Sequence, residues 1–486
     1  MIMKKILWFR HDLRVEDNLA FNAACKDGEV LPVFIYDQNY WELETSSSYH
    51  LKFTKDSLEE LNQNFKDQFN SKIHIFYGDT LKILDELINK YNFEEIYSNQ
   101  IFRNQYTLDL DQKCKSLFKE KNILWHQEQQ FGIQLENRKR NFWSSQWNNF
   151  IDLNPVKAQK NCKFLKVDTP SFDKIKTKEI DGTNIQKGGR KQALSLLQSF
   201  LDQRSENYQK EMSSPITGEV ACSRLSPHIT YGTISLREIN FAITSAKKEN
   251  MSFNKVKSLR SFRSRLAWHC HFIQKIYDEP EIEWQNMNRA YDGLRENSFN
   301  EEYHHAWKIG LTGYPFVDAC MRYLKANGWI NFRMRAMLVS FASYQLWLDW
   351  RKTSKHMAQL FTDYEPGIHY SQFQMQSGTT GINTIRIYNP IKQSTDQDPN
   401  GSFIKKWVPE LQNVPDKLVH EPWKLTYLEQ KDLDLEIGKH YPHPIVDHHS
   451  SSKIARDKIW QIKKTDEAKF NAQKILQKHA SAKGRR

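Results

Sequence analysis

The stretch that decides the fold is residues 312–335, TGYPFVDACMRYLKANGWINFRMR, in a chain of 486 residues. Gly313-Tyr314-Pro315 interrupts the chain, and a proline at a helix start costs little because its missing N–H has no helical partner there. Apolar residues then recur at helical spacing, at Phe316, Cys320, Tyr323 and Leu324. Gly328 ends this helix, and a second helix begins with Arg333 and Arg335. Taken alone, the pattern is typical of two ordinary core helices.

Short apolar runs alternate with amphipathic runs at the start of the chain. The apolar runs predict buried strands at residues 6–9, 30–36, 73–77, 95–97 and 123–125. Residues 53–65 and 81–91 have helical periodicity, so the alternation predicts a parallel, doubly wound sheet. Gly28 and Gly78 are the only glycines among the first hundred residues. The glycine-rich dinucleotide fingerprint is therefore missing, which excludes a nicotinamide dehydrogenase of that type.

The chain divides by pattern into four parts. We expect an α/β domain over residues 1–131 and, over 132–189, an irregular, polar, lysine-rich connector. Helical periodicity over residues 190–449 predicts an all-α domain. Residues 450–486 form a basic tail that we expect to be helical, and the simplest interpretation is a solvated surface helix.

Composition limits the classes of function. The net charge of +12 suits a polyanionic partner, although basic surface also serves solubility. The six cysteines are scattered without paired spacing, which argues against a disulfide framework, a zinc site or an iron–sulfur cluster and fits a reducing compartment. No apolar run reaches membrane-spanning length. We therefore expect a cytoplasmic monomer with no membrane segment and no metal.

Several motifs resemble those of one family. They are LWFRHDLR at residues 7–14 followed by Asp17-Asn18, SRLSP at 223–227, TGYP-x-VDA-x-MR-x-L-x-x-x-GW from Thr312, LDWR at 348–351, RIYNP at 386–390 and WVPEL at 407–411. Together they resemble, in order and over nearly the whole chain, the photolyase/cryptochrome family of flavin photoenzymes. The resemblance implies an α/β antenna-type domain followed by a helical FAD-binding domain.

The resemblance also implies the residues that bind FAD. Those expected to hold the phosphates are Tyr208, Ser223, Arg224, Leu225 and Ser226, although SRLSP taken alone is an ordinary helix cap.

Beside the flavin ring, Arg335 and Asp363 match the family's buried ion pair, and Glu365 matches a second carboxylate. His369 falls opposite the flavin N5, where photolyases usually have Asn, and a histidine there is expected to titrate near neutral pH. A shift of one residue would put Ile368 or Tyr370 at that place instead.

A lesion pocket is implied too. Trp268 matches the tryptophan that stacks on a flipped dimer, and the expected DNA-binding set is Arg263, Arg265, Trp268 and Met375. A core tryptophan is the competing interpretation. The family's dimer-contacting glutamate is Arg265 here, its second pocket tryptophan is Met375, and an Asn and a Met of dimer-repairing relatives are Phe332 and Ala336. Ala336 also stands where (6-4) photolyases have a histidine. The pocket residues therefore match neither the photolyases of cyclobutane dimers nor those of (6-4) lesions.

The family's tryptophan chain for flavin reduction is incomplete. Trp350 matches its middle member, whereas the flavin-proximal place is Phe373 and the outer place falls near Asn297. Residues that could substitute are Trp329, Trp347, Tyr370 and Tyr388.

A second, light-harvesting chromophore is found in the α/β domain of many relatives. The glutamate that binds folate in some of them aligns with Arg103 here, so folate binding of that type is not expected, and the identity of the chromophore stays open.

The function implied is that of a deoxyribodipyrimidine photo-lyase. In that reaction light excites reduced FAD, and an electron passes to a cyclobutane pyrimidine dimer in UV-damaged DNA, which splits. One alternative is a cryptochrome-like blue-light receptor with little or no repair activity, and another is a flavin-carrying nucleic-acid-binding protein without photochemistry. A repair assay separates these interpretations.

Overall fold

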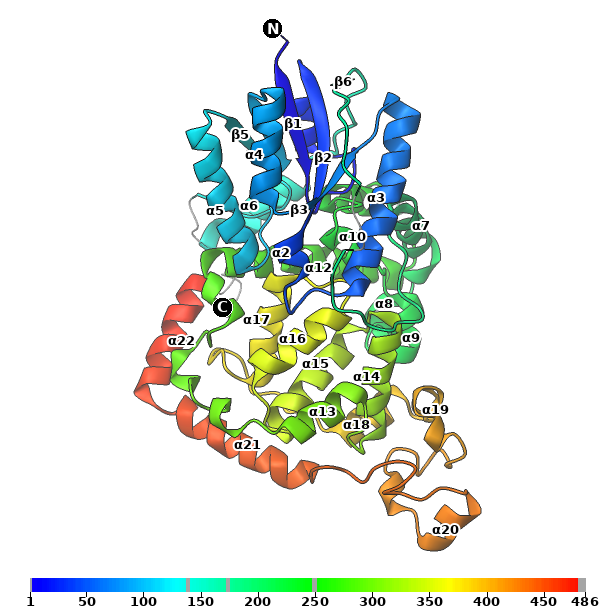
Figure 1. The fold of residues 1–486 in the computed structure, drawn as a ribbon. Helices are drawn as coiled ribbons and strands as arrows, with labels where there is room; N and C mark the ends of the chain where they lie inside the picture. Colours follow the sequence, from blue (N-terminus) through cyan, green and yellow to red (C-terminus); the bar gives the residue numbers. More distant parts are fainter. Residues whose placement is uncertain (1, 137–139, 172–174, 247–250, 480–486) are drawn as a thin grey trace.

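The computed structural model describes residues 2–136, 140–171, 175–246 and 251–479. A parallel sheet with its helices forms one end of the molecule, and a larger group of helices forms the other (Figure 1). This is the expected fold class, an α/β domain followed by an all-α domain. Residues 480–486, the end of the predicted tail, lie outside the described part of the chain.

The strands are β1 (Lys4–Phe9), β2 (Glu29–Asp37), β3 (His74–Gly78), β4 (Glu95–Asn99), β5 (Leu124–Glu128) and β6 (Lys163–Phe164). The five main strands lie in the order β3-β2-β1-β4-β5 and pair in parallel. Alternate side chains of β1 enter two separate cores, Leu7 and Phe9 on one face and Ile6 and Trp8 on the other. Because both faces are covered at the centre of the sheet, β1 and β2 consist largely of apolar residues, as buried parallel strands usually do.

The helices that cover the sheet are α1 (Leu19–Ala24), α2 (Gln38–Trp41), α3 (Ser48–Phe69), α4 (Thr80–Tyr91) and α5 (Gln105–Glu120). The five predicted strands and the two predicted helices, within α3 and α4, are confirmed.

The helical domain contains many short elements. From its start to the long helix these are α7 (Arg190–Ser199), η2 (Phe200–Arg204), α8 (Tyr208–Glu211), α9 (Pro215–Ala221), α10 (Ser226–Thr230), α11 (Leu236–Ser245) and α12 (Phe253–Asp278). Next come η4 (Pro280–Glu283), η5 (Arg289–Tyr291), η6 (Glu296–Ser298), α13 (Glu301–Ile309), α14 (Pro315–Asn327), α15 (Phe332–Ser340), η7 (Phe341–Gln345), α16 (Trp350–Leu360) and α17 (Pro366–Ser377). The last are α18 (Pro390–Gln397), α19 (Ser402–Trp407), η8 (Pro409–Leu411), η9 (Pro422–Lys424), α20 (Tyr427–Asp432), α21 (His448–Lys463) and α22 (Asp466–His479).

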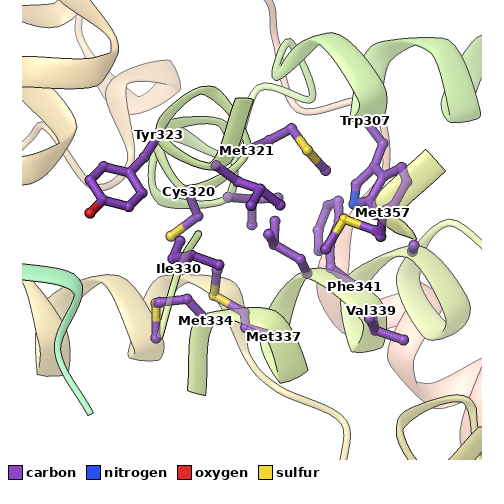
Figure 2. Close-up of a cluster of buried hydrophobic side chains, with 14 of the residues drawn as sticks. Trp307, Cys320, Met321, Tyr323, Ile330, Met334, Met337, Val339, Phe341 and Met357 are labelled. Atoms are coloured by element: carbon purple, nitrogen blue, oxygen red, sulfur yellow. The ribbon is translucent and has the colours of Figure 1, made fainter. Parts of the chain in front are cut away.

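Helices α14 and α15 form the centre of the helical core, as the stretch 312–335 predicts. Figure 2 shows side chains of α14 and α15 packed with Trp307 of α13 and Met357 of α16. Gly328 ends α14 in the left-handed conformation, with φ of 63°, which glycine adopts without strain. A Cβ at this position would lie 2.3 Å from Oγ1 of Thr362, so the turn also requires a residue without a side chain.

The connector is not irregular throughout, contrary to expectation, because it contains η1 (Arg140–Phe142), helix α6 (Trp143–Ile151) and strand β6, which adds to the sheet beside β2. In addition, Cys162 of the connector forms a disulfide with Cys25, although the scattered cysteine spacing argues against a disulfide framework. The two residues are 137 positions apart, and the pairing of β6 with β2 helps to place them together, which spacing along the chain does not show.

The tail is helical, as predicted, but it is not merely solvated. Ala455 and Ile459 of α21 are fully buried against the helical domain. At the end of α22, Nε2 of His479 lies 2.7 Å from a carboxylate oxygen of Glu279, and the carbonyl of Lys478 accepts a hydrogen bond from Nε of Arg140. Among the described residues, no helix is both long and apolar enough to cross a bilayer.

The buried histidines predict how stability depends on pH. Burial lowers the pKa of eight imidazoles to between about 2 and about 4, those of His50, His74, His228, His269, His271, His304, His356 and His369. Burial also raises the pKa of some carboxyls, to about 6 for Asp318 and to about 7 for Glu283 and Glu365. These carboxyls have the opposite effect on stability, but they are fewer than the eight histidines.

We expect the free energy of unfolding to fall as the pH is lowered from about 7 to about 5.5, by roughly 2 kcal/mol or more. The reason is that the unfolded chain takes up protons on histidines that remain neutral in the folded protein. Urea unfolding midpoints measured across this range test the prediction, and a midpoint that stays constant or rises on acidification contradicts it.

Candidate flavin site

The centre of the site is the turn Asp363-Tyr364-Glu365 between α16 and α17. Asp363 receives two hydrogen bonds from the Arg335 guanidinium of α15, at 3.0 Å from Nη1 and 2.9 Å from Nη2. The same guanidinium lies 4.2 Å above the ring of Phe361. The Asp363 side chain is buried, so it needs this bidentate partner to offset the loss of hydration. The structure therefore contains the ion pair that the sequence predicts.

The second carboxylate, Glu365, is paired with an arginine of the other domain. Nη1 of Arg103 lies 3.2 Å from Oε2 of Glu365, and Nη2 donates to the carbonyl of Tyr364 at 2.9 Å. The two side chains are 4% and 5% exposed, so the ion pair is almost completely shielded from solvent. Burial raises the pKa of Glu365 to about 7, and Arg103 opposes that rise. The other carboxylate oxygen, Oε1, is buried without a partner.

Sequence reasoning missed this role of Arg103. The position was considered only as the place of an antenna-binding glutamate, and Arg103 is 262 residues from Glu365 in the chain. No local pattern signals the pairing. The one available clue was a cationic residue directly after the buried segment Ile101-Phe102, near the carboxyl end of β4.

His369 is buried among aromatic rings. The centroid of its ring lies 4.5 Å from that of Phe373 and 5.1 Å from that of Tyr364. Its Nε2 lies 2.9 Å from the carbonyl of Ser354 in α16. Burial lowers the pKa of His369 to about 3, so the ring is neutral at physiological pH. The expectation that it titrates near neutrality is therefore wrong, because the local sequence does not show how completely the imidazole is enclosed. Its place opposite the flavin N5 stays a prediction.

The predicted phosphate-binding segment runs from α9 to the start of α10. Arg224 has a positive φ of 61°, and its guanidinium lies 4.0 Å above the ring of Trp329, next to Gly328. Leu225 is fully buried, Ser223 is nearly so, and Ser226 is the first residue of α10. Tyr208 packs edge-on against Phe200 and Phe262.

Three arginines act electrostatically on Cys222, at the start of this segment. Burial raises the pKa of the Cys222 thiol to about 11, and Arg224, Arg335 and Arg204 act against that rise. Cationic groups beside a backbone turn suit the pyrophosphate of a dinucleotide. Residues 223–226 and Arg335 thus lie in one electropositive region.

These residues fit a flavin nucleotide. Buried polar atoms without partners include Oδ1 of Asn331, Nε of Arg333 and Oε1 of Glu365, so acceptors and a donor remain for a ligand. Within the described residues, no group of three or more His, Cys, Asp or Glu side chains could hold a metal ion.

The predicted lesion-pocket residues differ in their surroundings. Trp268 of α12 is 49% exposed, and the guanidinium of Arg265 lies 4.9 Å from its ring. Phe332, at the start of α15, is 52% exposed, and Met375 of α17 is partly buried. Exposure argues against Trp268 as a core residue, because a core tryptophan would be covered.

Arg263 does not join the group around Trp268. Its guanidinium donates to Asp152 and to Asn240, both at 2.8 Å, and lies 5.4 Å from the Trp147 ring. These donors are already engaged, so the structure gives Arg263 a role in packing α12 against α6 and α11.

The residues of the predicted electron route are buried. Trp350 is 1% exposed and donates from Nε1 to Oδ1 of Asn286 at 2.8 Å. Its ring centroid lies 6.4 Å from that of Tyr370, whose hydroxyl is 3.2 Å from the hydroxyl of Tyr364. The aromatic rings thus continue from Trp350 to the turn beside Asp363.

The fold and the site together define a two-domain flavoprotein whose carboxylate turn is held by arginines of both domains. Two family models match the chain, "DNA photolyase" over residues 5–131 and "FAD binding domain of DNA photolyase" over residues 262–461. The chain belongs to the photolyase/cryptochrome family, and it binds FAD.

Several curated relatives are named deoxyribodipyrimidine photo-lyase, and two of them illustrate the range of similarity. The protein of Agrobacterium fabrum is 28% identical over 483 residues, which are 95% of this chain and 98% of that protein. The protein of Alkalihalophilus pseudofirmus is 34% identical over 270 residues, and the match spans only 55% of this chain and 54% of that protein.

Two solved structures resemble the whole chain. A class III photolyase from Agrobacterium tumefaciens has a TM-score of 0.83 at 27% identity, covering 96% of this chain and 98% of the other. An archaeal photolyase from Sulfolobus tokodaii, solved with two FAD molecules, has a TM-score of 0.77 at 28% identity, covering 94% and 100%.

Replacement of Asp363 by alanine tests the ion pair. We expect Asp363→Ala to lower the free energy of unfolding by about 3 kcal/mol, because Arg335 is left without its partner. We also expect it to release FAD, measured as the ratio of flavin to protein absorbance after dialysis. The matched control is Asp416→Ala, which removes an ion pair with Lys405 whose carboxylate is 59% exposed. This control should cost less than about 1 kcal/mol and keep FAD. Full flavin retention in Asp363→Ala would refute the assignment.

Proposed function

We propose that the protein is a deoxyribodipyrimidine photo-lyase that repairs cyclobutane pyrimidine dimers in UV-damaged DNA. The observation that carries the proposal is the exposed Trp268 with Arg265 above its ring, in a chain whose FAD-binding domain contains two buried carboxylates that are paired with arginines. Light-driven DNA repair is supported more generally by relatives named photo-lyase that match nearly the whole chain.

When bound and reduced, FAD would supply the light-driven one-electron chemistry that opens the dimer. The residues of the protein do the rest. The flat face of Trp268 replaces the stacking that a flipped base pair loses, and the cation of Arg265 suits a nearby phosphate. Asp363 and Glu365, with their arginines, hold the cofactor in a region from which water is excluded. His369 contributes an uncharged imidazole ring to the proposed flavin site.

The pocket residues differ from those expected for either lesion class, so the choice of cyclobutane dimers rests on the family resemblance of the sequence and is part of the proposal. A second chromophore is consistent with the two FAD molecules of the Sulfolobus tokodaii photolyase. We propose that such a chromophore binds without the help of Arg103, whose guanidinium is engaged with Glu365 and Tyr364. The cytoplasmic location and the monomeric state expected from the sequence remain predictions.

A repair assay with a matched pair of tryptophan variants tests this function. We expect protein with reduced flavin to split a cyclobutane dimer in an oligonucleotide under blue light, as shown by chromatography of the product. Trp268→Ala should lose about 1–3 kcal/mol of binding to the damaged strand, because one stacking surface is removed, and should keep its flavin. Trp460→Ala is the control, because Trp460 on α21 is similarly exposed, at 44%.

Equal affinities of the wild type and Trp268→Ala would show that the pocket lies elsewhere. Absence of repair, with equal affinity for damaged and undamaged DNA, would overturn the photo-lyase assignment and favour the photoreceptor alternative.

Replacement of Trp350 tests the electron route. Trp350→Phe should slow the light-driven reduction of the bound flavin several-fold, because phenylalanine is much harder to oxidise than indole. Trp307→Phe controls for lost packing, since Trp307 is also fully buried in the helical core. The rate is followed as bleaching of the oxidised-flavin band in the presence of an external reductant. Identical rates in both variants and the wild type would mean that electrons reach the flavin by another path.

A further inference from the structure

A cavity of about 500 Å³ lies at the seam between the two domains, apart from the flavin site. Its walls come from the end of α2 and the residues after it, from residues 176–178 of the connector, and from α13 and α16. In Figure 1 the labels α2, α13 and α16 mark this side of the molecule. The volume is typical of sites for small molecules. Trp268, Phe332 and Met375 are not among the residues that line it.

The cavity is strongly basic. Five lysines line it, at positions 176, 178, 308, 352 and 355, against two glutamates, at 42 and 44. Lys355 is paired with Glu44 and Lys352 with Glu301, which neutralises two of the five. No ion pair joins Lys176, Lys178 or Lys308 to another residue in the described part of the chain. The walls therefore carry positive charge that the protein itself does not balance.

The same cavity is lined by polar side chains that lack partners. Nε2 of His304, Nε2 of His356 and Oγ1 of Thr177 are buried atoms without a hydrogen-bond partner among the described residues. The two imidazoles lie beside the fully buried Trp307, with ring centroids 6.2 Å and 5.8 Å from the indole. Their positions are thus fixed by the core, and Nε2 of each ring has no hydrogen-bond partner among the described residues.

The pKa values of the two imidazoles are consistent with unbalanced positive charge from the lysines. Burial lowers the pKa of His304 to about 4 and that of His356 to about 3, and in both cases Lys308 is the largest charge contributing to the shift. An imidazole beside unneutralised lysines is neutral when no anion is present. Buried polar atoms without partners are rare in folded proteins and call for an explanation.

We propose that this interdomain cavity binds an oxyanion carried by a small molecule of nucleotide size, a phosphate ester or a polycarboxylate. Ammonium groups, an imidazole N–H and a hydroxyl are all donors, and the oxygens of such an anion are the matching acceptors. Because residues of both domains and of the connector form the walls, a bound anion would bridge all three. The proposal does not depend on the photo-lyase assignment, since no residue of the flavin site takes part.

Calorimetric titration of the FAD-loaded protein tests the proposal, with pyrophosphate, ATP and citrate as probes. We expect one site per chain for at least one probe, and comparison of the phosphates with citrate identifies the class of anion. The double variant Lys178→Gln/Lys308→Gln should bind about tenfold more weakly or worse, because two charge-assisted hydrogen bonds are lost. Thr177→Val, which removes one hydroxyl and no charge, should weaken binding less.

The control is Lys113→Gln/Lys115→Gln, which removes the same charge from exposed positions on α5. It should leave the affinity unchanged. Absence of saturable binding by all three probes would overturn the proposal. Equal weakening in the two double variants would also overturn it, because binding would then reflect only the net charge of the surface.

Discussion

The burial of two carboxylates in one turn is the constraint on which the rest of the structure depends. Asp363 and Glu365 flank Tyr364, and each would be costly to desolvate without an opposite charge. Arg335 meets the first from within the helical domain, and Arg103 meets the second from the sheet domain. The requirement for charge balance thus fixes α15 against the turn and helps to fix one domain on the other, so the turn that is predicted to bind the cofactor also takes part in domain docking.

The glycine turn after α14 connects the deciding stretch of sequence to this constraint. Gly328 accepts a hydrogen bond through its carbonyl from the amide of Thr362, the residue directly before Asp363. Trp329, its neighbour, stacks with Arg224 of the predicted phosphate-binding segment. One turn therefore contacts both the segment that carries the carboxylates and the predicted phosphate-binding segment. The geometry of this turn explains why Gly328 and Trp329 occupy the positions between α14 and α15.

Much of this could be predicted from the sequence, because the relevant signals are local. Continuous apolar runs indicate strands covered on both faces, and helical periodicity with glycine stops indicates α14. The pairing of Arg335 with Asp363 followed from family resemblance. The Arg103–Glu365 pair and the Cys25–Cys162 disulfide could not be predicted, since three-dimensional packing alone brings residues so far apart in the chain into contact. The protonation of His369 depends on enclosure by several helices, which no short motif encodes.

The last helix has a consequence for how the protein is made. The end of α22 returns to Glu279 of the helical domain and to Arg140 of the connector, so these contacts wait for residues translated 200 and 338 positions later. A nascent chain emerges from the ribosome at roughly 5–20 residues per second, and its early domains fold first. The sheet domain can thus complete its core during translation. The helical domain keeps an open flank until His479 has been synthesised, which leaves an interval in which a chaperone, or the flavin itself, can engage it.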